Sequence, residues 1–198
     1  MKEEAFAEHK IYSTNEIDKD INIDQILHEF EQNKEKYTYT HYINKRWENI
    51  YLNPQDIPSV LPLLSFAMST ALELFQDLLK PHQTLVIPHE LLGYEKNEFW
   101  FNSASRGEST GIHNHIEYAI VSGIFYLQVP ENSANLFFKR GKNNEFEIEA
   151  KKGKIVFFPS DLDHYVPKNK SNEARVSLAF NCYKFPLSTS IMHELPLI

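Results

Sequence analysis

Cysteine and long apolar runs are both scarce in this chain, and each scarcity excludes a class of protein. Cys182 is the only cysteine among 198 residues, so an intrachain disulfide cannot form, and a reducing location, the cytoplasm, is predicted. No run of about 18 apolar residues exists that could span a membrane. The charged start, Met1-Lys-Glu-Glu, and the short apolar run after it do not resemble a signal peptide.

Positive charge is also in short supply. The 20 lysines and arginines are outnumbered by 27 aspartates and glutamates, which gives a formal net charge of −7. No cluster of basic residues offsets this balance, and binding to a phosphate backbone depends on such clusters. We therefore predict that nucleic acid is not a partner.

Apolar residues at helical spacing predict two helices in the first part of the chain. The first is expected from a cap at Asp24 to about Lys36, and the second from Ser59 to about Lys80, where Pro81 ends it. The second helix should pack against the outside of a sheet through one apolar side. That side consists of Leu63, Leu64, Ala67, Ala71, Leu74, Phe75 and Leu78.

From Thr84 onward the pattern changes to short strand-like runs separated by turn signals. These runs are residues 84–87, 98–103, 111–120, 123–129, 134–139, 145–150, 155–158 and 174–183. Eight short strands without intervening helices predict a double-sheet jelly roll, a cupin-like double-stranded β-helix. The predicted class is mainly β with N-terminal helices. We expect one domain over 1–198, with a helical buttress at 1–83 and the jelly-roll core at 84–184.

The segment 111–117 places His113, His115 and Glu117 at alternating positions. Alternate residues share one face of a strand but lie about 6–7 Å apart, whereas metal–ligand bonds are only about 2 Å long. One ion can therefore be held by His113 with His115, or by His115 with Glu117. The residues alone leave both pairings open.

A third ligand must come from elsewhere in the chain, and His164 is the best candidate. It follows the apolar run 155–158 and a Pro-Ser-Asp turn signal, which predicts a position at a strand end. Asp163 is a weaker candidate, because neighbouring strand residues face opposite ways. Two histidines and a carboxylate on one face of a metal form the arrangement of non-heme Fe(II) oxygenases, and three imidazoles can also hold Fe(II).

Arg175 and Ser177 share one face of the alternating run at 174–181. A guanidinium fork beside a hydroxyl is a good receptor for a carboxylate. An arginine buried inside a barrel would need such an anion as its partner. The pair is therefore predicted to bind a carboxylate.

The order of these residues resembles the 2-oxoglutarate/Fe(II)-dependent oxygenases, and more closely a subgroup of small members. The resemblance covers about residues 98–183. The shared motifs are Trp100-Phe-Asn102, Arg106-Gly107, His113-Asn-His115, Ser122-Gly to Tyr126-Leu127, Phe158-Pro159 to His164, and Arg175-Val-Ser177 to Asn181. The chain departs from the subgroup by one additional residue before Ser122-Gly and by Glu117, where the subgroup has a small residue.

The resemblance implies Fe(II) as the metal and 2-oxoglutarate as a cosubstrate. Counted from Gly107, His113 falls where the subgroup has its first ligand. The implied metal ligands are therefore His113, His115 and His164, with Glu117 beside the metal rather than on it.

The resemblance also implies which residues contact 2-oxoglutarate. Arg175 and Ser177 would bind its far carboxylate. Asn102 matches a position whose polar side chain can touch the cosubstrate. Tyr126 is a further candidate, although it could equally be an ordinary core residue.

The implied activity is that of a dioxygenase that hydroxylates a small-molecule or peptide substrate and releases succinate and CO₂. Tyr42, Trp47, Arg106 and Glu108 are candidates for the mouth of the substrate site, and the oligomeric state stays open, a homodimer included. Three other interpretations remain. They are a three-histidine cupin metalloenzyme without 2-oxoglutarate, a non-catalytic metal- or ligand-binding jelly roll, and a structural sandwich without iron.

Overall fold

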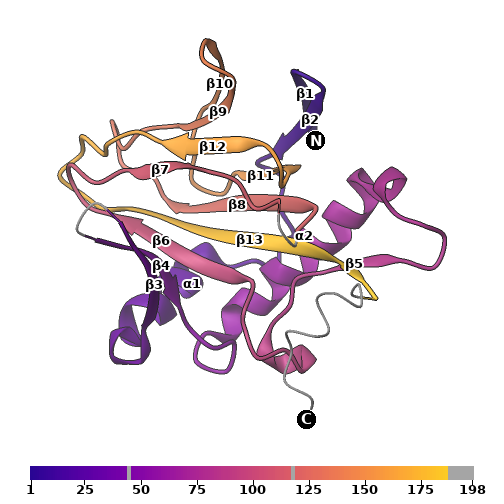
Figure 1. The fold of residues 1–198 in the computed structure, drawn as a ribbon. Helices are drawn as coiled ribbons and strands as arrows, with labels where there is room; N and C mark the ends of the chain where they lie inside the picture. The colour runs from indigo at the N-terminus through magenta and orange to yellow at the C-terminus, as the bar shows by residue number, and fades with distance from the viewer. Residues whose placement is uncertain (44–45, 117–118, 187–198) are drawn as a thin grey trace.

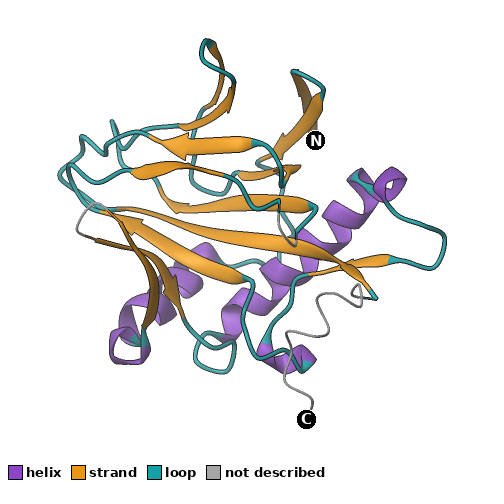
Figure 2. Ribbon diagram, in the orientation of Figure 1, coloured by secondary structure: helices purple, strands orange, loops and turns teal. Residues whose placement is uncertain are grey.

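Two antiparallel β-sheets face each other in this protein, and the helices cover the far side of the larger sheet (Figures 1 and 2). The structure is a computed structural model that describes residues 1–43, 46–116 and 119–186. Its mainly β architecture with N-terminal helices confirms the predicted jelly-roll class.

Thirteen strands are assigned within the described residues, nine in the larger sheet and four in the smaller. The larger sheet contains β1 (Lys2–Phe6), β2 (His9–Thr14), β3 (Thr38–Ile43), β4 (Arg46–Tyr51), β5 (Thr84–Val86), β6 (Phe99–Ala104), β8 (Val121–Gln128), β11 (Ile155–Pro159) and β13 (Arg175–Phe185). Their order is β1-β2-β11-β8-β13-β6-β4-β3, and β5 pairs with β13. The smaller sheet contains β7 (Thr110–His113), β9 (Leu136–Arg140), β10 (Asn144–Ile148) and β12 (Asp163–Val166), in the order β10-β9-β12-β7.

The N-terminal part is more than a helical buttress. It holds the predicted helices, α1 (Ile23–Gln32) and α2 (Leu61–Leu74), but β1 to β4 also extend the larger sheet at both edges. Short 3₁₀ turns complete the helical segments at Lys34–Lys36, Pro58–Val60, Gln76–Leu78 and Glu90–Leu92. No helix in the described part of the chain is long and apolar enough to cross a membrane. The cytoplasmic location stays a prediction.

Two details of the predicted helices are wrong. Asn22, not Asp24, caps α1, because its side-chain oxygen accepts a hydrogen bond from the Gln25 amide at 3.0 Å. Asp24 lies in the first turn, where a negative charge suits the helix dipole. Leu78 was expected to be buried but is 47% exposed, because α2 ends at Leu74 and a 3₁₀ turn follows.

Two strand predictions also need correction around the site. The expected strand at 111–120 is too long, because β7 ends at His113 and leaves His115 in the loop that follows. Strand β12 was missed, although its four residues include His164 at the second position. Strands this short give almost no periodic signal in a sequence.

Alternation along β13 divides the protein into an apolar side and a polar side of the larger sheet. Val176, Leu178 and Phe180 belong to the core that the helices cover. Arg175 and Ser177, with the opposite parity, line a cavity between the two sheets. Since both sides of this central strand are buried, polar residues at those positions are unusual and indicate a site.

Candidate metal centre

Three histidines from separate segments meet between the two sheets. Each can offer one ring nitrogen, and these nitrogens all lie within 4.8 Å of one another. His113 and His164 are direct register partners on β7 and β12, with ring centroids 4.3 Å apart. His115 is held beside them because its backbone N–H donates to the Ser160 carbonyl at 2.8 Å. The structure therefore brings together the three predicted ligands.

Backbone carbonyls orient two of the three imidazole rings. The Nδ1 atom of His113 lies 2.8 Å from the Gly111 carbonyl oxygen, and Nδ1 of His164 lies 3.0 Å from that of Leu162. Since a carbonyl oxygen can only accept, Nδ1 carries the proton in both rings. The Nε2 lone pairs of His113 and His164 are thus free to bind a metal.

Burial keeps His115 and His164 uncharged at neutral pH. It lowers the pKa of His115 to about 3, with further lowering by the charges of His113 and His41. Burial likewise lowers the pKa of His164 well below its ordinary value, again assisted by the other two ligand candidates. Neutral imidazole is the form that coordinates metals.

The two alternative metal ligands are Asp163 and Glu117. Asp163 accepts a hydrogen bond from the Asn114 side chain at 2.8 Å and is not one of the clustered residues. Glu117, the alternative to His113, lies outside the described residues. Among the described residues, the ligand set is formed by histidines alone.

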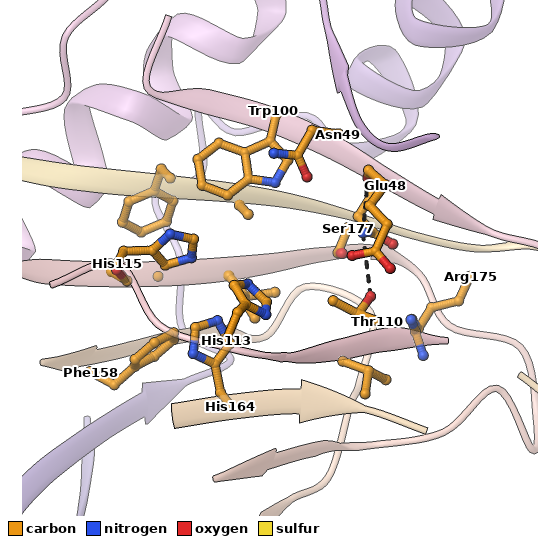
Figure 3. Close-up of a pocket in the computed structure, with 17 residues that line it drawn as sticks. Glu48, Asn49, Trp100, Thr110, His113, His115, Phe158, His164, Arg175 and Ser177 are labelled. Atoms are coloured by element: carbon orange, nitrogen blue, oxygen red, sulfur yellow. Dashed lines mark hydrogen bonds between the residues drawn. The ribbon is translucent and has the colours of Figure 1, made fainter. Parts of the chain in front are cut away.

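A cavity extends from the three histidines toward Arg175 (Figure 3). Predicted residues Asn102, Arg175 and Ser177 line it, and Tyr126 is not among its lining residues. Trp100 also lines it, with its ring 5.5 Å from that of His115. The remaining polar residues of its lining are Glu48, Asn49, Thr110 and Ser122.

Arg175 provides a buried positive charge in this cavity. It is only 2% exposed, and its guanidinium donates to the Ser133 carbonyl at 2.7 Å. Burial lowers its pKa to about 10, so the side chain stays charged at neutral pH. No carboxylate among the described residues pairs with it, which leaves capacity to bind an anion.

Tyr126 lies in the apolar core between the sheets. It is 2% exposed, and its hydroxyl makes no hydrogen bond to the described residues. Burial raises its pKa, while the charge of Arg175 lowers it, which places the phenol within electrostatic range of the guanidinium. A buried hydroxyl without a partner is costly, so this atom is a candidate for contact with a ligand.

Asn102 is held by the strand β4. Its side-chain oxygen accepts from Arg46 at 3.0 Å, and its amide nitrogen donates to the Glu48 carbonyl at 3.0 Å. Its side chain therefore connects β6 and β4 as well as facing the cavity. Arg46 and Glu48 are not among the predicted site residues, because nothing in their local sequence indicates that they are buried beside the cavity.

The four candidates for a substrate mouth do not line the cavity itself. Arg106 is exposed and donates to the Asn172 side chain at 2.7 Å. Glu108 accepts from the Ser105 backbone amide at 2.6 Å and lies 3.5 Å from Arg46. Tyr42 and Trp47 are exposed on the β3–β4 hairpin.

Comparisons with known proteins agree with this geometry. The model of a family described as "Putative 2OG-Fe(II) oxygenase" matches residues 139–181, which include His164, Arg175 and Ser177. No curated protein matches the chain. Among solved structures, a Pseudomonas putida prolyl-4-hydroxylase superposes with a TM-score of 0.62 at 17% identity, covering 89% of this chain and 92% of that one. The fold is that of the 2-oxoglutarate/Fe(II) oxygenases.

Two further oxygenase structures share this fold. The α-ketoglutarate-dependent carbocyclase SnoK from nogalamycin biosynthesis gives a TM-score of 0.64 at 11% identity, over 87% of this chain and 79% of that one. A prolyl hydroxylase from Trichoplax adhaerens, in complex with a hypoxia-inducible-factor peptide fragment, gives 0.63 at 12% identity, over 87% and 83%. At such identities the likeness concerns the fold, and the family match supports the predicted resemblance and its two cofactors.

The residues of the cavity fit both Fe(II) and 2-oxoglutarate, the metal and the cosubstrate of those oxygenases. Three clustered imidazoles suit Fe(II), which accepts nitrogen ligands. The unpaired guanidinium of Arg175, with Ser177 beside it on the same face of β13, suits a carboxylate. The unpaired Tyr126 hydroxyl adds a donor near that charge.

Proposed function

We propose that this protein is a non-heme Fe(II)- and 2-oxoglutarate-dependent dioxygenase, with His113, His115 and His164 holding the iron. The observation that carries the proposal is one cavity that holds three clustered histidines and a buried guanidinium without an anionic partner among the described residues. We further propose that Arg175 and Ser177 bind the far carboxylate of 2-oxoglutarate, assisted by Asn102 and Tyr126. When bound, the metal and 2-oxoglutarate supply O₂-dependent oxidation coupled to the formation of succinate and CO₂.

The chain itself positions these groups and excludes water. The carbonyls of Gly111 and Leu162 keep His113 and His164 in the tautomer that exposes Nε2. Phe158 packs 4.8 Å from the His164 ring, and Trp100 packs against His115 on the other side of the cavity. Apolar walls strengthen the electrostatic attraction of Arg175 for a carboxylate.

The substrate is proposed to be a small molecule or a peptide that is hydroxylated. The two prolyl hydroxylases of similar fold, one of them bound to a peptide fragment, support this choice. We also propose that the chain acts as one domain. Strands from the first 83 residues are interleaved with later ones, β2 pairing with β11 and β4 with β6, which supports a single unit.

Anaerobic titration of the apoprotein with Fe(II) and then 2-oxoglutarate tests the proposal. Bidentate binding of the cosubstrate should produce a visible charge-transfer band. His115→Ala should abolish metal binding, and Arg175→Ala should weaken the cosubstrate by roughly 30-fold or more, because an ion pair in a buried site is lost. The exposed residues His82 and Arg106 provide matched controls, and His82→Ala and Arg106→Ala should leave the band unchanged. A wild-type protein that binds Fe(II) without the band would refute the cosubstrate.

A second candidate is a three-histidine metalloenzyme that uses no 2-oxoglutarate. The all-imidazole ligand set among the described residues favours it, because oxygenases of the facial-triad type use a carboxylate. Calorimetry separates the two functions. This second candidate predicts metal binding by the three histidines, with no heat from 2-oxoglutarate in either the wild type or Arg175→Ala.

A further inference from the structure

A second buried charge faces the same cavity, and it is negative. Glu48 on β4 is only 5% exposed and lines the cavity together with the three histidines and Arg175. Its Oε1 atom is fully buried and has no hydrogen-bond partner among the described residues. An unpaired buried carboxylate is strongly disfavoured, so something absent from the chain itself should satisfy it.

Neither Arg46 nor Arg175 forms an ion pair with Glu48 in the structure. The Arg46 guanidinium donates to Asn102 at 3.0 Å and to the Ser103 carbonyl at 2.9 Å, and its ion pair is with Glu108. The Arg175 guanidinium donates to the Ser133 carbonyl. Within the described residues, no ion pair involves the Glu48 carboxylate.

The position of Glu48 suits contact with a substrate rather than with the metal or 2-oxoglutarate. Its side chain is not a member of the metal-ligand cluster. Figure 3 shows it reaching into the cavity from the β4 side, between Trp100 and Arg175, with the histidines on the opposite side. A carboxylate there would repel the anionic cosubstrate but attract a cation.

An exposed aromatic surface begins beyond Asn49, the residue that follows Glu48 on β4. Asn49 also lines the cavity, and Trp47 lies on the same face of β4 as Asn49. Trp47 is 45% exposed, and its ring lies 5.0 Å from that of Tyr42, which is 60% exposed. Exposed aromatic faces attract cations and cover the apolar parts of a ligand that emerges from the cavity.

We propose that Glu48 determines substrate specificity and selects a substrate that carries a cationic nitrogen, an amine or a guanidinium. The cation pairs with the Glu48 carboxylate, while the remainder of the substrate passes Asn49 toward Trp47 and Tyr42. This inference rests on the proposed oxygenase function only in the claim that the bound cationic molecule is oxidised. The binding of the cation depends on Glu48 alone and can be measured without turnover.

The test measures binding of n-butylamine to the wild-type protein and to Glu48→Gln by tryptophan fluorescence and by ligand-detected NMR. The wild type should bind n-butylamine, and n-butanol and butyrate should bind much more weakly. Glu48→Gln should weaken n-butylamine by roughly 30-fold or more, because one partner of a buried charge pair is removed. Glu145→Gln removes the same charge at an exposed residue of β10 and should leave the affinity for n-butylamine unchanged.

Measurements of stability and of the charge-transfer band show whether Glu48→Gln loses amine binding through misfolding, and whether the amine site stands without the oxygenase function. Glu48→Gln should be at least as stable as the wild type, because it keeps the shape of the side chain and removes an unpaired buried charge, and it should still show the charge-transfer band. Equal binding of n-butylamine to wild type and Glu48→Gln, or equal binding of n-butanol and n-butylamine, would overturn the proposal. Absence of the band in both proteins, with amine binding still dependent on Glu48, would refute the oxygenase function and leave the cation site standing.

The source of the cation can be distinguished in the same experiment. A blocked peptide with one central lysine is compared with n-butylamine. A peptide that binds at least tenfold tighter, with this gain lost in Trp47→Ala, indicates a side chain of a peptide substrate. Equal affinities indicate a free small amine, and both results retain Glu48 as the recognition residue. Failure of both probes to bind would overturn it.

Discussion

Removal of a single oxygen atom from Tyr126 should stabilise the ligand-free protein. The hydroxyl is buried without a hydrogen-bond partner, and such a group costs about 1–3 kcal/mol of desolvation. Tyr126→Phe removes this cost and leaves a void no larger than one atom. We expect the free energy of unfolding of the metal-free protein to rise by about 1 kcal/mol.

Tyr37 offers a matched control with the opposite sign. Its hydroxyl donates to the Phe30 carbonyl at 2.6 Å in a partly buried position. Tyr37→Phe leaves that carbonyl with one hydrogen bond fewer and should lower the free energy of unfolding by about 1 kcal/mol. Urea denaturation followed by circular dichroism measures both variants under identical conditions.

Tyr126→Phe should also bind 2-oxoglutarate less tightly than the wild type does. A hydrogen bond to a charged group contributes about 1.5–3 kcal/mol, so the affinity should fall by roughly tenfold or more. Opposite effects on stability and affinity would identify a hydroxyl that serves the ligand. If Tyr126→Phe is destabilised as much as Tyr37→Phe, the hydroxyl has a partner in the free protein and the reasoning is wrong.

Three further changes test the packing, the capping and the charges of the fold. Gly123→Ala should destabilise by about 1–3 kcal/mol, because its new Cβ would lie 2.2 Å from Cζ of the buried Phe180 ring. Recovery in Gly123→Ala/Phe180→Leu, measured by urea denaturation, would confirm the clash, and additive losses would contradict it. Asn22→Ala should cost about 1 kcal/mol through loss of the α1 cap, whereas Asp24→Ala should cost clearly less. For Glu98, burial is the main cause that raises the pKa above its ordinary value, so the wild type loses stability as the pH rises from about 4.3 through that raised pKa. Glu98→Gln should lack this loss, and identical pH profiles of the two unfolding free energies would exclude Glu98 as its origin.

The sequence by itself determined the fold class and named the three histidines that the structure brings together. Regular turn signals between β-rich runs were sufficient for the jelly roll, because strands of this type are specified by local composition and alternation. The alternation of Arg175 and Ser177 placed both on one face, as β13 shows. His113, His115 and His164 could be named in advance because few residue types bind Fe(II), and these three stand at positions that resemble a known motif.

Only the tertiary structure decided which side chains surround that chemistry. Arg46 and Glu48 belong to a strand of charged and aromatic residues, which by sequence alone is indistinguishable from a solvated edge. Pairing of β4 with β6, and contact of Arg46 with Asn102, bury them beside the candidate metal centre. Likewise, the resemblance named Tyr126, but its unpaired hydroxyl follows from the burial of one face of β8, a strand of the larger sheet, in the core cluster that also contains β9 residues. Burial and partnership arise from residues distant in the chain, so local patterns could not predict them.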